Sequence, residues 1–398
     1  TTIGDAADVA RYTYLIQHTS NSDADALDVV FTDTFPAEVE FDISDVTVTL
    51  DDGVTQTDIT SSFEVSGQIL RTKSGTPVDI ELGSTVTIVL DATLGDIVEP
   101  GESVINDAAD ITWTSIDGTD AGERDGSGSG ENDYSASSGT TNVTIPAATF
   151  SKLFVGTSVN TSNNAANEVV VGEIVQYQLT LPLVEGTTLV ANIVDTLDVG
   201  LVFLKLDSIT TSGGVTSNLG DLNDTGTVGI STNGQDGTTA SQVITLDLGN
   251  VSNPGDGDAE SIVIVYSARV LNNAGNTSNG SRAGTALNNS ALLQWNLTGS
   301  GTQSTGSSSA ATVEVIEPEL EISQTLEVNP GSGTTIGDAA DVARYTYLIQ
   351  HTSNSDADAL DVVFTDTFPA EVEFDISDVT VTLDDGVTQT DITSSFEV

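Results

Sequence analysis

Apolar and polar side chains alternate through most of this 398-residue chain, and turn-forming residues bound the alternating runs. Examples are STVTIVLDATL, SQVITLDLGNV and ESIVIVYSARVL, which are rich in β-branched residues. A period of two places every second side chain on the same face of a strand, and almost no segment shows a helical period. Many short strands separated by Gly, Asn, Asp and Ser are typical of immunoglobulin-like sandwiches. The pattern predicts an all-β fold of antiparallel β-sandwiches.

A long exact repeat decides the organisation of the chain. Residues 1–65 recur without one change as residues 334–398, an offset of 334 − 1 = 333. Identity that includes solvent-facing positions indicates near-identical tandem units rather than old, diverged repeats. We therefore expect one complete unit here, followed by the start of the next, within a longer precursor.

A weaker repeat divides the unit into two domains. PAATFSK (146–152) aligns with PELEISQ (318–324), and each segment leads into an alternating strand. We predict domain A at 1–145, with a first strand upstream that is equivalent to 319–333. Domain B is predicted at 146–318, and 319–398 would begin the next copy of domain A. The linkers at Pro146 and Pro318 are short, which favours stiff beads on a string.

Two segments carry a resemblance to a known family. YTYLIQHTSNSDADALDVVFTDTFPAEVEF joins an aromatic strand, a loop of Asn, Ser and Asp, and a strand ending in D-T-F-P. Domain B repeats the arrangement in VQYQLTL and VDTLDVGLVF, but Asp198 replaces the proline. The chain resembles the domain-of-unknown-function-eleven repeats of prokaryotic surface proteins and the isopeptide-forming domains of fimbriae. This resemblance implies extracellular, Ig-like stalk or fibre domains without enzymatic activity.

The charge of the chain excludes several kinds of partner. Nine Lys and Arg stand against 60 Asp and Glu, which gives a formal net charge of −51. Such a chain repels phosphates, which argues against nucleic acid and anionic membranes. There is no Cys and only two His, so little is available for cysteine or histidine catalysis or for zinc. No apolar run is long enough to insert into a membrane.

One lysine suggests a crosslink in domain B. Of the three lysines, Lys152 lies in the first strand of that domain. In family members that crosslink themselves, a first-strand Lys joins a late-strand Asn beside a buried acid that polarises the amide, which implies Lys152, Asn289 and Asp195 here. Parity supports two of these positions, because Asn289 shares a strand face with Trp295, and Asp195 with the apolar residues two positions away. The alternative is that Lys152 lies on the surface and Asp195 is a hydrogen-bonded turn acid.

Domain A does not carry the same set. The residues that match Lys152 and Asn289 are Gln324 and Asp107, so both reacting groups are expected to be missing. Domain A would then be held by packing alone.

Loop acids and sequons provide further candidate sites. Carboxylates in loops are the hard oxygen ligands that Ca²⁺ prefers, although solvated acidic loops are the alternative and none matches an EF-hand. No cofactor is required. The calcium candidates are Asp23, Asp25, Asp28, Asp256, Asp258 and Glu260. The glycosylation candidates, in a chain rich enough in Ser, Thr and Asn to contain sequons by chance, are Asn160, Asn223, Asn276 and Asn296.

These features together predict a structural protein, not an enzyme. We expect the subunit of an extracellular or cell-surface filament, stalk or matrix fibre, whose partners are further copies of itself. The alternative is the spacer region of a large repetitive adhesin whose binding domain lies outside this sequence.

Overall fold

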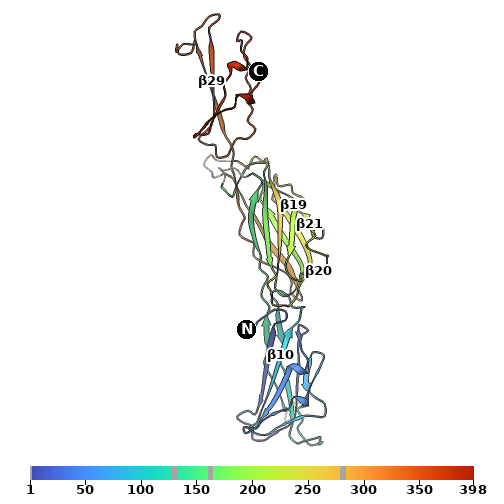
Figure 1. Cartoon of the computed structure of the whole chain (residues 1–398). Helices are drawn as coiled ribbons and strands as arrows, with labels where there is room; N and C mark the ends of the chain where they lie inside the picture. Colours follow the sequence, from blue (N-terminus) through green and yellow to red (C-terminus); the bar gives the residue numbers. More distant parts are fainter. Residues whose placement is uncertain (1, 128–132, 160–164, 278–283) are drawn as a thin grey trace. The chain divides into compact units, whose positions relative to one another are not determined.

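The computed structural model describes residues 2–127, 133–159, 165–277 and 284–398 (Figure 1). In these ranges every regular element is a β-strand, apart from 3-10 helices of one turn at Ile43–Asp45, Thr60–Ser62, Ile376–Asp378 and Thr393–Ser395. Paired strands run antiparallel except in the pairs β1–β14 and β16–β27. The predicted all-β, antiparallel fold is confirmed. None of the helices among the described residues is long and apolar enough to cross a membrane.

The first sandwich surrounds a core that extends from Ala6 to Ile145. Its sheets have the orders β2-β10-β5-β6 and β13-β12-β3-β8-β7, and a smaller sheet has the order β1-β14-β11. Strand β10 shows how the alternation builds the core, because every second residue from Val86 to Leu94 is buried. The strands are β1 (Thr2–Ile3), β2 (Val9–Gln17), β3 (Ala26–Thr34), β4 (Val39–Glu40), β5 (Val46–Asp51), β6 (Gln56–Asp58), β7 (Phe63–Ser66), β8 (Ile69–Thr72), β9 (Val78–Ile80), β10 (Thr85–Leu94), β11 (Ser103–Asn106), β12 (Asp110–Thr114), β13 (Ser135–Ser137) and β14 (Thr141–Thr144).

The second sandwich has a separate core that extends from Val169 to Val315. Its sheets have the orders β15-β17-β23-β19, β20-β22-β18-β25-β26 and β16-β27-β24. The two cores share no residue. The domain boundaries at 145 and 318 stay predictions. The strands are β15 (Ser151–Thr157), β16 (Glu168–Val169), β17 (Ile174–Pro182), β18 (Gly186–Leu197), β19 (Leu201–Thr211), β20 (Thr216–Ser217), β21 (Gly229–Thr232), β22 (Gln242–Asn253), β23 (Ser261–Val270), β24 (Ala286–Leu287), β25 (Asn289–Leu297), β26 (Gly301–Ser304) and β27 (Val313–Val315).

The repeated sequence at the end of the chain forms fewer strands. Strands β28 (Leu320–Val328) and β29 (Ala343–His351) pair as an antiparallel hairpin. Residues 359–398 form a compact unit of their own, in which β30 (Thr382–Asp384) pairs with β31 (Gln389–Asp391). The same sequence pairs in the same register in the first copy, where Thr49 is opposite Asp58. Local sequence is therefore sufficient to specify this hairpin.

Candidate crosslink site

Strand register brings Asp195 and Asn289 to one place in the second sandwich. Strand β18 sends alternate residues into the core, and Asp195 is one of them. Strand β25 pairs with β18 so that Asn289 is opposite Leu197 and Ala291 is opposite Asp195. Asp195 and Asn289 are therefore diagonal neighbours on the same sheet face, within reach of each other's side chains. Lys152 comes from β15, at the edge of a different sheet, and its side chain is also directed inward.

The three predicted residues meet in the core. Lys152 Nζ lies 2.6 Å from each carboxylate oxygen of Asp195 and 2.5 Å from Asn289 Oδ1. Relative exposure is 5% for Lys152 and 0% for both Asp195 and Asn289. The amine thus lies against the amide group that it would attack, in a site without access to solvent.

Burial opposes the charged forms of both ionisable groups. It lowers the pKa of Lys152 to about 8, although Asp195 nearby partly offsets the effect. Burial also raises the pKa of Asp195, against the opposing effects of Lys152 and the Tyr266 hydroxyl. Nζ of Lys152 also lies over the rings of Tyr177 and Tyr266, 5.1 and 5.3 Å from their centroids. Because both shifts favour neutral forms, moving the proton from Lys152 to Asp195 costs less here than it would between two exposed groups.

Tyr266 on β23 is a fourth member of the site and was not predicted from the sequence. Its hydroxyl donates to Asp195 Oδ2 at 2.8 Å and accepts from Asn289 Nδ2 at 2.6 Å. No hydrogen bond among the described residues joins Asp195 directly to Asn289. Asp195 was expected to polarise the amide directly, but the Tyr266 hydroxyl lies between the two groups. A signal was available, because Tyr266 occupies an inward position of the alternating run SIVIVYSARV, and a buried tyrosine hydroxyl needs partners.

Domain A carries a counterpart that differs from the prediction. Asp33 and Asn106 are both 2% exposed, and Asn106 Nδ2 donates to Asp33 Oδ2 at 2.9 Å. Tyr14 donates its hydroxyl proton to the same carboxylate oxygen. Asp107, the expected match for Asn289, is exposed, and that prediction is wrong. Trp113 on β12 matches Trp295, and counting back six residues from it gives Asp107. The count fails because β11 ends at Asn106 and β12 begins only at Asp110, so the alternation is interrupted between them.

Only the lysine is therefore missing from the domain A set. Gln324, the expected match for Lys152, lies on β28 of the second copy and donates to the Tyr347 hydroxyl at 2.8 Å. Tyr347 is Tyr14 in the repeated sequence. An amide at this position cannot act as the nucleophile, so no crosslink is expected in domain A.

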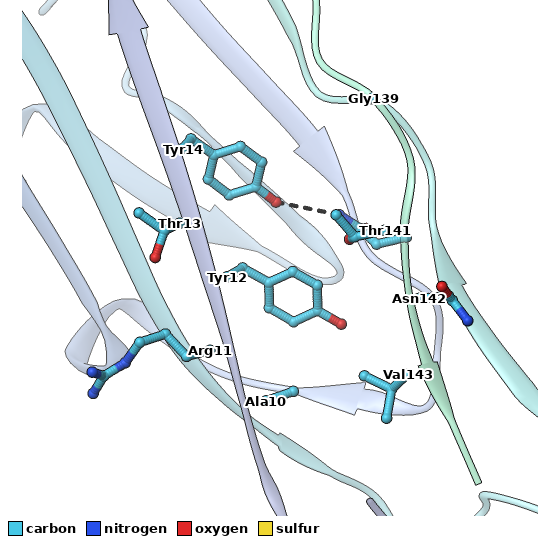
Figure 2. Close-up of a pocket in the computed structure, with 10 residues that line it drawn as sticks. Ala10, Arg11, Tyr12, Thr13, Tyr14, Gly139, Thr141, Asn142 and Val143 are labelled. Atoms are coloured by element: carbon cyan, nitrogen blue, oxygen red, sulfur yellow. Dashed lines mark hydrogen bonds between the residues drawn. The ribbon is translucent and has the colours of Figure 1, made fainter. Parts of the chain in front are cut away.

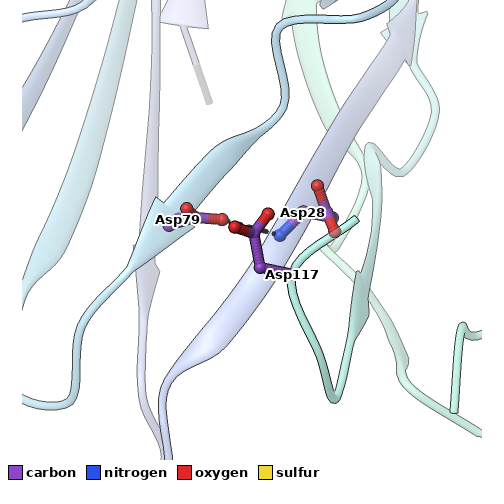
Figure 3. Close-up of side chains that lie close together, drawn as sticks. All are labelled: Asp28, Asp79 and Asp117. Atoms are coloured by element: carbon purple, nitrogen blue, oxygen red, sulfur yellow. Dashed lines mark hydrogen bonds between the residues drawn. The ribbon is translucent and has the colours of Figure 1, made fainter. Parts of the chain in front are cut away.

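The first group of calcium candidates is arranged differently from the prediction. Carboxylate oxygens of Asp28, Asp79 and Asp117 lie within 4.8 Å of one another (Figure 3). Asp28 contributes from β3 with a left-handed backbone, φ 50°, and its N–H donates to Asp79 at 2.9 Å. Asp23 and Asp25 are exposed and are not members of this group. The prediction selected acids that are close together in the sequence, and this was wrong. Strand pairing brings Asp79 to β3 from a distant part of the sequence.

The second group of calcium candidates includes Glu185, which was not predicted, and excludes Asp258, which was predicted. Asp256 and Glu260 lie with Glu185, again within 4.8 Å, whereas exposed Asp258 is not a member. Glu185 accepts backbone hydrogen bonds from Asp256 and Gly257 at 3.2 and 2.6 Å. Calcium binding at either group stays a prediction.

The sequons have different accessibilities. Asn160 lies outside the described residues. Asn223 is exposed and Asn296 is half-buried, and both side chains hydrogen-bond to neighbours. Asn276 is 3% exposed, and its Nδ2 donates to the carbonyls of Gly200 and Leu271. The fold leaves no room for a glycan at Asn276, because that nitrogen would have to leave the protein interior.

Comparisons with known proteins give distant structural neighbours only. No family model matches the chain, and no curated protein matches it. The C-terminal domain of the AgI/II polypeptide BspA from Streptococcus agalactiae is 12% identical, with 79% of this chain and 96% of that chain covered and a TM-score of 0.34. BcpA, the major pilin subunit of Bacillus cereus, is 12% identical over 77% and 79%, with a TM-score of 0.28.

A third neighbour is the collagen-binding domain from a Staphylococcus aureus adhesin. It is 15% identical, with 42% of this chain and 96% of that chain covered and a TM-score of 0.23. The resemblance to fimbrial domains stated from the sequence thus recurs among the structural neighbours.

Proposed function

We propose that this protein is a structural subunit of an extracellular filament or stalk, and that domain B stabilises itself with an isopeptide bond between Lys152 and Asn289. The observation that supports it most is the contact of a buried amine with a buried amide oxygen beside a buried acid. Burying the ammonium of Lys152 costs desolvation energy, even though Asp195 pairs with it. Conversion of the amine into an amide removes that cost.

The reaction needs no other reagent. Lys152 passes one proton to Asp195, and the neutral amine attacks Cγ of Asn289. Asp195 returns a proton through the Tyr266 hydroxyl to Nδ2, which leaves as ammonia, and a second proton from the attacking nitrogen then reaches Asp195. The C–Nδ2 bond breaks and the Nζ–C bond forms. One ammonium, one carboxylate and one primary amide become one secondary amide, one carboxylic acid and one ammonia.

The position of the bond suits a protein that bears tension. It would join β15, the first strand of the domain, to β25, a late strand, across 137 residues. Force applied along the chain would reach a covalent bond before it could peel β15 from β17. Together with the exact repeat of 65 residues, this favours a load-bearing array over an enzyme.

Intact mass spectrometry of the full chain tests the proposal. The mass should be lower than calculated by one ammonia, and Lys152→Ala and Asp195→Ala should each restore the calculated mass. Lys205→Ala is the matched control, because Lys205 is exposed and pairs with Asp207 at 2.8 Å on the surface. An uncrosslinked wild-type mass, or a tryptic peptide that ends at Lys152, would refute the crosslink.

A further inference from the structure

Two buried residues of domain B, Asn253 and Glu260, carry side-chain atoms without a hydrogen-bond partner in the described part of the chain. The unpaired atoms are Glu260 Oε2 and both polar atoms of Asn253, and the two residues are 5% and 1% exposed. Similar atoms in domain A, on Tyr12, Asp33 and Asn106, lie at the counterpart of the crosslink site, where Figure 2 shows Tyr12. Asn253 and Glu260 belong to neither site. Buried polar groups normally have a partner, so these two residues require another explanation.

Glu260 faces two other carboxylates instead of a cation. Oxygen atoms of Glu185, Asp256 and Glu260 lie within 4.8 Å of one another. Glu185 is also buried, with 7% of its surface exposed. The ion pairs of the described ranges involve other acids, so no lysine or arginine there neutralises this group. Buried carboxylates without a cation raise the free energy of the folded state, and a bound metal ion would remove that cost.

Two connections between the sheets of domain B form this group. Glu185 lies in the connection from β17 to β18, and Asp256 and Glu260 lie in the connection from β22 to β23. Strands β17 and β23 share one sheet, and β18 and β22 share the other. Glu185 Oε1 accepts hydrogen bonds from the N–H groups of Asp256 and Gly257. Leu183 N–H donates to the carbonyl of Glu260 at 2.9 Å, so both connections are already held together by the chain itself.

The chemistry of the donors favours calcium. Ca²⁺ binds six to eight oxygens of carboxylates, amides and carbonyls at about 2.3–2.6 Å, so two of its ligands can be up to about 5 Å apart. The three carboxylates satisfy this limit, and the group contains none of the nitrogen or sulfur ligands that zinc prefers. Strand register places Asn253 opposite Gly186, next to Glu185, where its unpaired Oδ1 provides a neutral oxygen.

We propose that Glu185, Asp256 and Glu260 bind one Ca²⁺, which joins the two connections between the sheets of domain B. The ion supplies the partner that Glu260 Oε2 lacks within the chain. Because the three ligands come together only in the folded domain, calcium binding stabilises the folded state over the unfolded state. The inference goes beyond the proposed function and does not depend on the isopeptide bond.

Isothermal titration calorimetry of the full chain with calcium chloride tests the site. Every sample carries Asp79→Asn, which disables the other acidic group (Figure 3), and contains about 0.15 M monovalent salt to screen the remaining charge. We expect one ion per chain, with a Kd of about 10⁻⁴ to 10⁻³ M, as in extracellular modules. Glu260→Gln and Asp256→Asn should each weaken binding about tenfold or more, since each removes one of three charged ligands. Asp258→Asn is the matched control, because Asp258 is an exposed acid of the same loop outside the group.

Thermal melting of the same samples separates a metal ligand from a merely structural residue. In chelator, Glu260→Gln should melt no lower than its parent, because it removes a buried charge, but it should lack the parent's gain in calcium. Asp256→Asn should lose the gain without any change in the core, because Asp256 is exposed. The site is overturned if binding is not saturable, if Asp258→Asn weakens it as much as Glu260→Gln does, or if Glu260→Gln lowers the melting temperature equally in calcium and in chelator. None of these outcomes affects the mass test of the crosslink.

Discussion

Replacing Lys152 with glutamine should remove the isopeptide bond and leave the site filled. Glutamine is the residue that β28 carries at the matching position, so the fold already accepts an amide there. Asp195 would lose its cation, but burial already raises its pKa, and the protonated acid can remain hydrogen-bonded to Tyr266. The main consequence of Lys152→Gln is then the loss of one covalent constraint on the unfolded chain.

The size of that constraint follows from the length of the loop that it closes. Lys152 and Asn289 are 137 residues apart. By the loop-closure relation used for disulfides, a loop of this length contributes about 5 kcal/mol at room temperature. For a domain of this size each kcal/mol shifts the melting temperature by roughly 2–4 °C, so the variant should melt roughly 10–20 °C lower.

Differential scanning calorimetry of the full chain provides the assay. The transition of domain A is the internal reference, because its core shares no residue with the core of domain B. Intact mass in the same samples shows whether wild type is crosslinked and the variant is not. If the masses differ by the crosslink but the domain B transition moves by less than a few degrees, the loop-entropy reasoning is refuted.

Two further predictions address the same sites. In Asn289→Ala, which keeps the Lys152–Asp195 pair but cannot crosslink, the folded Lys152 has a pKa of about 8 against an ordinary 10.5. The folded state then binds fewer protons than the unfolded state between these values, so the free energy of unfolding in urea should rise from pH 8 to 10.5, and a fall would contradict the burial argument. Calcium should raise the melting temperature of wild type, and Asp79→Asn should reduce the gain; chelation without effect on wild type at fixed ionic strength would exclude a site at Asp28, Asp79 and Asp117.

The sequence by itself determined the elements and the direction of most side chains. Alternation fixes which residues of a continuous strand face the core, and Asp195 and Asn289 do so because their strands run unbroken to the apolar residues beside them. The repeat of 65 residues also required no structure to be recognised. These are local properties, set by the two-residue period of an extended chain.

Only the tertiary structure decided which residues meet. Asn106 replaced Asp107 because an interruption between β11 and β12 resets the alternation. Tyr266 entered the site because β23 lies in the sheet that also contains β15, and Asp79 joined Asp28 because β9 pairs with β3. Register and sheet order are relations between distant segments, and a local pattern does not contain them.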